Sequence, residues 1–588
     1  MLSDRRRLFP LGAAVAAVAL TGMLSEVRLA VLFSVIVTAI AALGLDLLVA
    51  RTGELSLAHA AFLGVGAFTA INVGGRGATW GIAVIAAVAV TAAVATVVGL
   101  PSLRIRGLQV AIATLAFQDA AEKYLFTRED VTAGDKLLSR PSVLRTDTRL
   151  YLLALAALAL VLLVRRRVTT TRAGRSFVAV RDIGERARSF GVEPGPTKLL
   201  AYALSGAIVG LAGALLATHE GTIGTATDPF RLLESLQLVA IAVVGGAGSA
   251  TGIVIAAFLV KGLPQLAGGD FLRDWTPIIS AGLLVVAVVA QPRGVGGVLR
   301  DIVDRALPKR ATPSPPVEGV DLASVERPLA LRLPVPALLR AHEVSVTYGG
   351  LRALDRLTLE VRKGEIVGLI GANGAGKSTF FNAVSGFAPV TGSIRYRDVE
   401  LLQTRPAGRT ALGTARTFQD MGLVRAETVA ENLLLAQTWL ADYPSALGIL
   451  GLGSTVRRER ELRRRAHAAL EIFGLRELAG ERLGDLPYGT MRRVEIASAV
   501  AAGPDLLLLD EATAGLGPEE SHALAGTFLD LRAELGLTLV VIEHHVPVIA
   551  RVCDYAYCLE SGVLIAEGAP VDVTADPAVI ASFLGTRP

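Results

Sequence analysis

The sequence predicts a polytopic α-helical membrane domain followed by a soluble α/β domain. The chain has 588 residues, of which 52% are hydrophobic and only 19% are charged, and its mean hydropathy is +0.53. Soluble domains carry about 25% charged residues, so part of this chain belongs in lipid. Because the long apolar stretches end near residue 300, we expect the chain to leave the membrane there.

Whole-chain counts exclude two classes of protein. The net charge is only +5 and no long basic block is present, which argues against a nucleic-acid surface. The two cysteines, Cys553 and Cys558, are too few for a disulfide framework. We expect them to be ordinary half-buried thiols.

The apolar stretches of the first part are close to the ~20 residues that a membrane-spanning helix needs. With a shorter stretch at 107–118 as a partial span, we expect about 8 to 10 crossings. The first stretch follows three arginines and reads either as an uncleaved helix, which we favour, or as a signal peptide. The stretches are 8–25, 29–45, 55–75, 77–103, 150–164, 199–218, 235–260 and 275–291.

Charge placement predicts the orientation of these helices. Residues 165–188 hold eight arginines against Asp182 and Glu185, and such segments stay in the cytoplasm. The net acidic segment 219–234 should therefore lie outside. For the soluble part to be cytoplasmic, 235–260 must enter and return, with a turn in the glycine-rich 245–249, and Gly268 should be accessible from outside.

Several residues inside the apolar part are candidates for special roles. Gly206 and Gly210 form a small-xxx-small face that favours close helix packing. Asp46, Glu54 and His59 are ionisable groups in or beside apolar segments, where they are costly and often face a transport pathway. The alternative is that the residues around Glu54 form a surface turn.

A proline-rich linker separates the two parts. Residues 301–337 lack periodicity and contain seven prolines, which favour an extended tether. We therefore divide the chain into a membrane domain at 1–300, this linker, and a soluble domain at 338–588.

The soluble domain contains a phosphate-binding loop. Residues 371–378 read G-A-N-G-A-G-K-S directly after the β-rich run 365–370, which matches the G-x-x-x-x-G-K-S pattern. Its glycines let backbone N–H groups surround phosphates, Lys377 reaches the β- and γ-phosphates, and the Ser378 hydroxyl binds Mg²⁺.

Two further β-rich runs end in chemically active groups. The run 506–509 precedes Asp510 and Glu511, of which the first can hold Mg²⁺ and the second can polarise an attacking water. The run 537–542 precedes His544, which can contact the γ-phosphate.

These residues resemble the ATP-binding cassette (ABC) family, and the resemblance covers nearly the whole chain outside the linker. It implies an α/β P-loop ABC ATPase domain in which Tyr348 stacks on adenine, Gln419 senses Mg²⁺ and His544 is the switch histidine. The segment 486–490 corresponds to the signature that closes over ATP bound by a second cassette. Pro487, Thr490 and Gly517 depart from the family pattern, which leaves the signature half of the site less certain than the phosphate-binding half.

The resemblance thus implies ATP and Mg²⁺ as cofactors and ATP hydrolysis as the reaction. The implied catalytic residues are Glu511 and His544, and the implied Mg²⁺ ligands are Ser378, Gln419 and Asp510. The implied nucleotide-binding residues are Tyr348, Gly371, Asn373, Gly374, Ala375, Gly376, Lys377, Ser378, Thr379, Gln419, Asp510, Leu486, Tyr488 and Gly489.

Within this family, the sequence is similar to that of branched-chain amino acid importers. Segments 486–489, 457–465 and 583–585 resemble their ATPase subunit, and 42–49, 52–62, 99–104 and 244–249 resemble their permease, two subunits that are usually separate. The insertion 457–465 alone reads as a solvated helix. Asp46 and Glu54 stand where that permease usually has Asn and Gln, which leaves the substrate open.

The resemblance also implies that 171–192 is a cytoplasmic coupling segment that docks on an ATPase and transmits its closure. The alternative is a loop that only sets topology. The residues that carry this prediction are Gly174, Arg175, Arg181, Asp182 and Gly191.

The predicted function is ATP-driven import of branched-chain amino acids or related small polar solutes across the cytoplasmic membrane, with the ATPase in the cytoplasm. The implied partners are the lipid bilayer, an extracytoplasmic solute-binding protein, and a second permease and second ATPase from a homodimer or a paralogue. Alternatives are import of urea, amides or aromatic acids, an exporter, or a non-hydrolytic scaffold. Short loops argue against an exporter, and the presence of Glu511 and His544 argues against a scaffold.

Overall fold

A computed structural model of the chain describes residues 24–105, 107–132, 137–223, 230–266, 282, 294–298, 337–451 and 453–584. The chain divides into two compact units, one made of residues 1–170 and 195–311 and the other of residues 171–194 and 312–588. The apolar stretch 275–291 except Gly282, residues 301–336 of the linker, Gly268 and all but the last two residues of the first apolar stretch lie outside the described residues.

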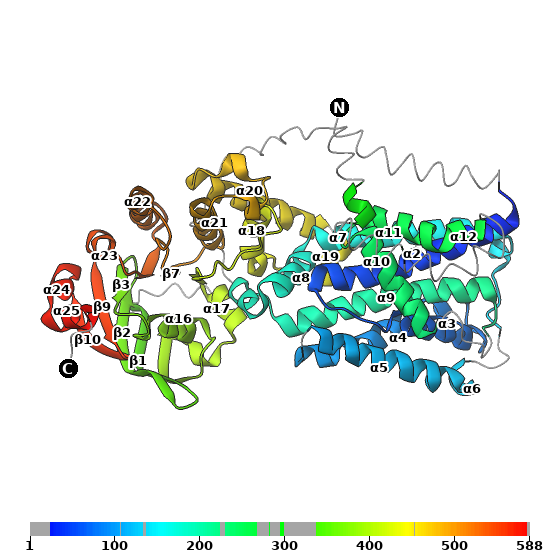
Figure 1. Cartoon of the computed structure of the whole chain (residues 1–588), viewed down its shortest axis with the longest axis horizontal. Helices are drawn as coiled ribbons and strands as arrows, with labels where there is room; N and C mark the ends of the chain where they lie inside the picture. Colours follow the sequence, from blue (N-terminus) through cyan, green and yellow to red (C-terminus); the bar gives the residue numbers. More distant parts are fainter. Residues whose placement is uncertain are drawn as a thin grey trace. The chain divides into compact units, whose positions relative to one another are not determined.

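The first unit is a bundle of apolar helices (Figure 1). Among the described residues, four helices are long and apolar enough to cross a membrane, namely Glu26–Thr52, Trp80–Leu103, Asp147–Thr169 and Pro194–Glu220. The total number of crossings stays a prediction. The elements of this unit are α2 (Glu26–Thr52), α3 (His59–Gly74), α4 (Trp80–Gly99), η2 (Leu100–Leu103), α5 (Leu108–Lys123), η3 (Leu125–Thr127), α6 (Glu129–Thr132), η4 (Ser142–Leu144), α7 (Asp147–Thr169), α9 (Pro194–Glu220), α10 (Leu232–Gly245), α11 (Ala250–Ala257), the π-helix η7 (Phe258–Gly262) and α12 (Leu263–Leu266).

Small residues let these helices pack closely, as predicted for α9. A Cβ added at Gly206 would lie 2.5 Å from the Cβ of Ala95 on α4, and one at Gly210 would lie 2.8 Å from the Cβ of Thr91. Real Cβ atoms do not approach so closely, so α9 and α4 require glycine at both positions. The close packing predicted for Gly206 and Gly210 is confirmed.

The predicted break in 235–260 is also present. Helix α10 ends at Gly245 and α11 begins at Ala250, where the Ser249 hydroxyl caps the new helix by accepting from the Gly252 N–H at 3.2 Å. A Cβ at Gly252 would lie only 1.9 Å from the carbonyl oxygen of Gly245, so glycine allows the two helices to meet at the turn. That both arms open to the same side of the membrane stays a prediction.

The second unit contains two sheets. The antiparallel sheet has the order β2-β1-β4-β5, and the larger sheet has the order β10-β9-β3-β8-β7-β6. In the larger sheet β9, β3, β8, β7 and β6 are parallel to one another, and β10 pairs with β9 antiparallel. The strands are β1 (Ala337–Tyr348), β2 (Leu351–Arg362), β3 (Ile366–Ile370), β4 (Val390–Tyr396), β5 (Val399–Glu400), β6 (Thr414–Arg416), β7 (Leu506–Asp510), β8 (Thr538–Ile542), β9 (Tyr555–Glu560) and β10 (Val563–Gly568).

The three predicted β-rich runs are β3, β7 and β8, and all three are fully buried. They alternate with helices along the chain, which is why they read as continuous apolar runs. Parallel strands end at the same edge of a sheet, so the loops after β3, β6, β7 and β8 gather in one place.

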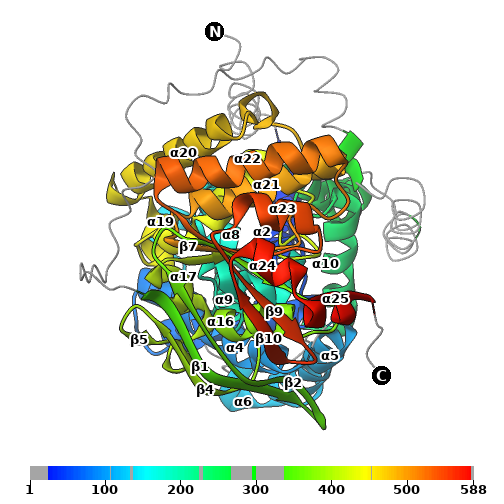
Figure 2. The same cartoon turned by 90° about the vertical axis from the view of Figure 1, so that its left-hand side faces the viewer.

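The second unit also contains helices. Figure 2 shows α20, α21 and α22 on one side of this unit and the strands β1, β2 and β4 on the opposite side. The helices are α8 (Arg172–Asp182), α16 (Lys377–Ser385), α17 (Pro406–Leu412), α18 (Val429–Ala436), α19 (Ser445–Leu450), α20 (Gly453–Ile472), α21 (Tyr488–Ala501), α22 (Pro518–Leu535), α23 (Val546–Val552), α24 (Pro570–Ala575) and α25 (Pro577–Leu584), with shorter turns η5 (Gly184–Phe190), η8 (Leu401–Gln403), η9 (Thr438–Leu440), η10 (Arg476–Leu478) and η11 (Leu483–Asp485).

Candidate functional site

The phosphate loop lies between β3 and the N-terminus of α16. Gly371, Gly374 and Gly376 adopt positive φ values of 143°, 82° and 103°, which favour glycine. A Cβ at Gly371 would lie 2.2 Å from the carbonyl oxygen of Leu559, whereas one at Gly374 would meet nothing within 4 Å. The loop is therefore fixed against the sheet at one end and open at Gly374, as a phosphate cradle must be.

Lys377 lies over this loop. Its ammonium donates to the carbonyl oxygens of Gly371 at 2.7 Å and Ala372 at 2.9 Å. Burial lowers the pKa of Lys377, although Glu511 and Asp510 act against this shift. The Lys377 ammonium thus lies against the phosphate loop, where it can bind a phosphate group. Of the other predicted loop residues, Asn373 is exposed, Ala375 is buried and Thr379 is half-buried.

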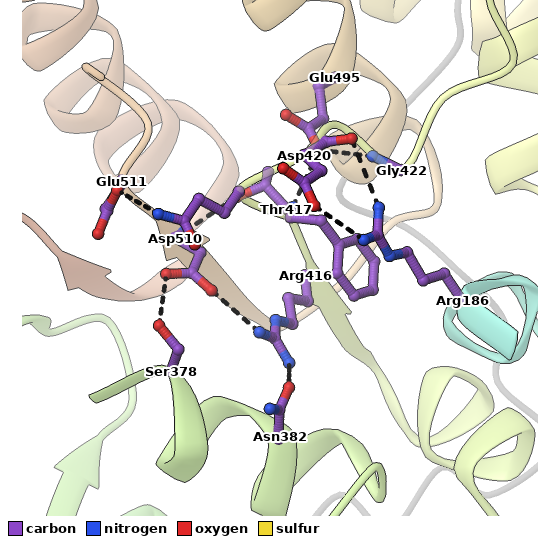
Figure 3. A network of polar contacts seen from close by, with 12 residues as sticks. Arg186, Ser378, Asn382, Arg416, Thr417, Asp420, Gly422, Glu495, Asp510 and Glu511 are labelled. Carbon is purple, nitrogen blue, oxygen red and sulfur yellow. Dashed lines mark hydrogen bonds and ion pairs between the residues drawn. The ribbon is translucent and has the colours of Figure 1, made fainter. Parts of the chain in front are cut away.

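Asp510 ends β7 and is almost fully buried. Its Oδ1 accepts from the Ser378 hydroxyl at 3.4 Å and its Oδ2 from Arg416 Nη2 at 2.9 Å, while its own N–H donates to the Thr417 hydroxyl at 3.0 Å. Figure 3 shows this network, in which Arg416 also donates to Asn382 Oδ1 at 2.8 Å. The structure therefore brings together two of the three residues predicted to bind Mg²⁺, Ser378 and Asp510.

Glu511 occupies a strained position directly after β7. Its φ is +49°, a conformation that non-glycine residues rarely adopt and that is often found at functional sites. Its Oε2 accepts from Gln419 Nε2 at 2.9 Å, and its Oε1 lies 3.0 Å from His544 Nε2. The structure thus brings both predicted catalytic residues, Glu511 and His544, into contact with each other and with Gln419.

Glu543 stabilises this arrangement through contacts with Thr513. The sequence did not indicate this role. The Glu543 carboxylate accepts from both the N–H and the hydroxyl of Thr513, each at 2.8 Å. Burial raises the pKa of Glu543, which these two hydrogen bonds partly oppose. The contact joins the loop after β7 to the loop after β8 and so fixes the spacing of Glu511 and His544.

The loop that carries Gln419 is attached to α21. The buried carboxylate of Glu495 accepts from the N–H groups of Phe418 at 2.9 Å and Gly422 at 3.2 Å, and Arg492 donates to the carbonyl oxygens of Phe418 at 2.9 Å and Gln419 at 2.7 Å. Arg492 and Glu495 also pair with each other at 2.9 Å. A displacement of this loop must therefore be accompanied by a displacement of α21.

Tyr348 and the signature residues are partly exposed. Tyr348 ends β1 and its residue is 43% exposed. Leu486 and Pro487 precede α21, which begins at Tyr488, and the closest neighbours of Tyr488 and Gly489 include residues of 515–520. This partly exposed position fits contact with a second cassette, which stays a prediction for Leu486, Tyr488 and Gly489.

The segment 171–192 is part of the second unit and is held to α20 by a buried ion pair. Arg175 of α8 makes two parallel contacts with Glu459 of α20, Nη1 to Oε2 and Nη2 to Oε1, both at 2.7 Å. The side chains are 5% and 11% exposed, and the Tyr443 hydroxyl also donates to Glu459. Although burial alone would raise it, the pKa of Glu459 is lowered by Arg175.

Further contacts surround this pair. Gly191 has φ +73°, and a Cβ there would lie 2.5 Å from the Cβ of Trp439. Gly174 is buried within α8, whereas Arg181 and Asp182 pair with each other at 2.6 Å. Apolar residues of the segment form one cluster with residues of α18, namely Val178, Ala179, Val180, Ala187, Phe190 and Val192 with Leu435, Ala436 and nearby Val424.

One contact joins the segment to the Gln419 loop. Arg186 Nη2 lies 3.1 Å from Asp420 Oδ2 (Figure 3). Its guanidinium lies 5.6 Å from the centre of the Phe418 ring. Arg186 is thus linked to Glu511 through two adjacent residues, because Asp420 contacts Arg186 and Gln419 contacts Glu511. This arrangement can carry a displacement of the segment to the acid predicted to be catalytic.

Comparisons with known proteins agree with this geometry. The family model described as the permease component of branched-chain amino acid transport systems matches residues 11–288, and the ABC transporter model matches 354–514. The high-affinity branched-chain amino acid transport ATP-binding protein LivG of Salmonella typhimurium is 38% identical over 42% of this chain and 98% of its own length. The chain belongs to the ABC transporter family.

A second relative of this ABC transporter chain gives the same result. The ATP-binding protein BraF of Pseudomonas aeruginosa is 35% identical over 42% of the chain and 98% of its own length. A solved ATP-binding cassette of an ABC transporter in its ADP conformation is 31% identical over 42% of the chain and 99% of that protein, with a TM-score of 0.38. This ABC transporter chain joins a membrane permease to an ATP-binding cassette in one polypeptide, and the cassette binds and hydrolyses ATP.

Besides Glu543, the sequence did not reveal the contacts of Arg416, Tyr443 and Glu459. The prediction that 457–465 is a solvated helix is wrong for one face of α20, where Thr455, Glu459 and Leu462 are buried. Spacing at i, i+4 and i+7 indicates such a face. The many arginines between these positions made the buried face of α20 difficult to recognise in the sequence.

The charged groups of the permease are paired across helices. Asp46 Oδ2 contacts Arg165 at 2.5 Å and its Oδ1 accepts from the Gly248 N–H at 2.8 Å, and Glu54 pairs with Lys198 at 2.5 Å. Glu54 is 6% exposed, so the alternative of a surface turn is wrong for this residue. His59 is fully buried and its Nε2 lies 2.9 Å from the Ser205 hydroxyl. These contacts favour structural roles for Asp46, Glu54 and His59 in holding α2, α3, α7 and α9 together.

Proposed function

We propose that this chain imports branched-chain amino acids at the expense of ATP. The observation that carries the proposal is the union, in one chain, of a permease matched to branched-chain amino acid systems and a cassette 38% identical to LivG. Segment 171–192 supports it, because its contacts with α20 and the Gln419 loop give a physical connection between membrane helices and ATPase.

The nucleotide site fits ATP with Mg²⁺. When bound, Mg²⁺ neutralises charge on the β- and γ-phosphates. Ser378 and Asp510, 3.4 Å apart, are the residues that would hold the ion. Gln419 would join them once it leaves Glu511, and Lys377 would exchange its contacts with the loop carbonyls for the phosphates.

Glu511 and His544 supply the chemistry of hydrolysis in this proposal. Glu511 orients a water and accepts its proton, because its carboxylate is half-enclosed and held by Gln419 and His544. His544 shares its proton with Glu511 and keeps that carboxylate pointed toward the phosphate loop. The positive φ of Glu511 turns the side chain away from the line of β7.

A complete transporter needs two cassettes and two permeases. The exposed signature residues of this chain would complete the ATP site of a partner, which is either a second copy or a paralogue. We further propose an extracytoplasmic solute-binding protein as the source of substrate. The arginine-rich segment 165–188 supports a cytoplasmic cassette and a location in the cytoplasmic membrane.

The test is uptake of labelled leucine, urea and benzoate by cells that carry the native chain, Glu511→Gln, or a deletion. Native cells should take up leucine, and Glu511→Gln should keep ATP binding but lower ATP turnover by about 10²–10⁴-fold, since a general base contributes that much. Glu534→Gln, which changes an exposed acid on α22, is the matched control and should behave as native.

Each alternative has its own outcome. If urea or benzoate uptake follows the gene instead of leucine, the substrate is wrong and the transporter stands. If cells without the gene retain more of a compound than native cells, the direction is export. If Glu511→Gln turns over ATP normally, the assignment of the catalytic acid is wrong.

A further inference from the structure

The permease unit contains a pocket that no motif predicted. It has a volume of about 290 Å³ and lies between α2, α3, α9, α10 and the π-helix η7, close to the lower end of the ~300–1,000 Å³ range of small-molecule sites. Most of its wall is apolar, including Val37, Leu63, Leu216 and Leu238. A pocket of this kind fits the aliphatic part of a small solute.

Three ionisable groups interrupt the apolar wall: Lys261, Glu234 and Glu220. Lys261 Nζ lies 3.2 Å from Glu234 Oε2, and the two side chains are 24% and 31% exposed. Glu220 also contacts His219 Nδ1 at 3.2 Å. The pocket therefore offers an ammonium and carboxylates side by side on an apolar surface.

The position of Lys261 indicates a role other than helix packing. It is the only formally charged residue of the apolar run Ala250–Leu266, and charges inside apolar helices usually mark a pathway or a binding site. It lies in a π-helical turn, Phe258–Gly262, and such turns occur frequently at functional sites. Two independent features thus point to the same residue.

The pocket is also at the correct end of the helices for a substrate that arrives from outside. Helix α9 begins at Pro194, directly after the coupling segment, and Glu220 is its last residue. At 1.5 Å per residue, the two ends are about 39 Å apart. With the coupling segment in the cytoplasm, Glu220 lies at the extracytoplasmic end.

We propose that this pocket binds the transported solute, and that the solute is a zwitterionic amino acid with an aliphatic side chain. Lys261 receives the carboxylate, Glu234 receives the ammonium and the apolar wall receives the side chain. The identity of the solute rests on the proposed function, whereas the place of binding does not. Asp46, Glu54 and His59, which the sequence suggested as a pathway, are absent from the pocket lining.

The test uses the full chain in right-side-out membrane vesicles, washed free of solute-binding protein. Thr38 lines the pocket and is half-buried, so Thr38→Cys places a thiol there for a membrane-impermeant methanethiosulfonate reagent. The native thiols give a low background, because burial raises the pKa of Cys553 to about 12 and of Cys558 to about 11. The parent chain measures that background.

Leucine should slow the labelling of Thr38→Cys. Leucinamide, which lacks the carboxylate, and isocaproate, which lacks the ammonium, should need about tenfold higher concentrations or more, since each loses a charge-assisted hydrogen bond. Lys261→Gln and Glu234→Gln should weaken protection by leucine to the same degree. Lys123→Gln, which removes an exposed Lys123–Asp119 pair of the same unit, should change it less than about twofold.

A folding defect is separated from a binding defect by the double variant Lys261→Met with Glu234→Gln. Combined with Thr38→Cys, it removes both charges at similar volume, so without leucine it should label like Thr38→Cys alone, and leucine should give no protection. If cells take up leucine but leucine never protects Thr38→Cys, the pocket proposal is wrong and the proposed function stands. If protection survives Lys261→Gln and Glu234→Gln, or if benzoate or urea protects in place of leucine, the zwitterion assignment is overturned.

Discussion

Removal of the charge from Glu459 should release the coupling segment from the cassette. Glu459→Gln keeps the size of the side chain but leaves the guanidinium of Arg175, only 5% exposed, without its anion. Breaking a buried ion pair from one side costs about 3–5 kcal/mol. We take the lower figure because glutamine can still accept one hydrogen bond.

A loss of about 3 kcal/mol makes local opening of the segment about 10²-fold more frequent, since 1.4 kcal/mol is a factor of ten. Hydrogen exchange of the backbone amides of α8, measured on the full chain, reports this opening directly. Glu461→Gln is the matched control, because Glu461 lies on the same helix and pairs with Arg458 at 53% exposure. It should change exchange by less than about threefold.

The same experiment has a pH dependence. The pKa of Glu459 is below its ordinary value, so its contribution is present above about pH 4.3 and is lost as the pH falls through the lower, folded value. Burial, followed by the hydrogen bond to Glu459, raises the pKa of Tyr443 to about 12, so its contribution is present below about pH 10 and is lost as the pH rises toward 12. After correction for intrinsic exchange rates, protection of α8 should be flat between about pH 5 and 9.

Two results would refute this reasoning. One is exchange of α8 in Glu459→Gln that equals exchange in Glu461→Gln. The other is a failure of the double variant Arg175→Met with Glu459→Met to recover protection, since an apolar pair of similar volume usually replaces a buried ion pair at little cost.

Two further predictions concern the interiors of the two units. Arg416→Met leaves Asp510 buried without its cation, so a loss of about 3 kcal/mol should lower the Tm of the cassette by about 6–12 °C in a thermal scan of the full chain; an unchanged Tm would show that Asp510 does not need this partner. Gly210→Ala forces a Cβ within 2.8 Å of Thr91 and should destabilise the permease by about 1–3 kcal/mol, seen as a lower Tm and less chain in the membrane, whereas Gly81→Ala meets nothing within 4 Å and should be neutral.

The elements that could be predicted from the sequence are those specified by local chemistry. The glycines of 371–376 predict a phosphate loop, because such a loop needs positive φ values. The apolar runs β3, β7 and β8 predict buried strands, because a strand covered on both faces needs unbroken apolar residues. The convergence of Asp510, Glu511 and His544 follows from parallel strands that end at one edge.

The contacts that escaped the sequence depend on segments far apart in the chain. Glu459 lies among arginines on a helix that reads as solvated, and only its partner Arg175, 284 residues earlier, explains its burial. Lys261 reads as one charge in an apolar run until the fold places Glu234 and the apolar wall of the pocket around it. Spacing can indicate that a residue such as Glu459 is buried, but it does not identify a partner that lies far away in the chain.

The contact between residues 171–192 and the cassette affects how the transporter assembles. In a transporter made of separate subunits, that contact forms by collision and its occupancy depends on how much of each subunit the cell makes. Here permease and ATPase are parts of one polypeptide, so they are synthesised in equal amounts and the contact forms within one chain, at a raised effective concentration. A weakened contact such as Glu459→Gln is therefore re-formed by its own chain, so this protein should tolerate dilution and unequal expression that would dissociate a two-subunit relative.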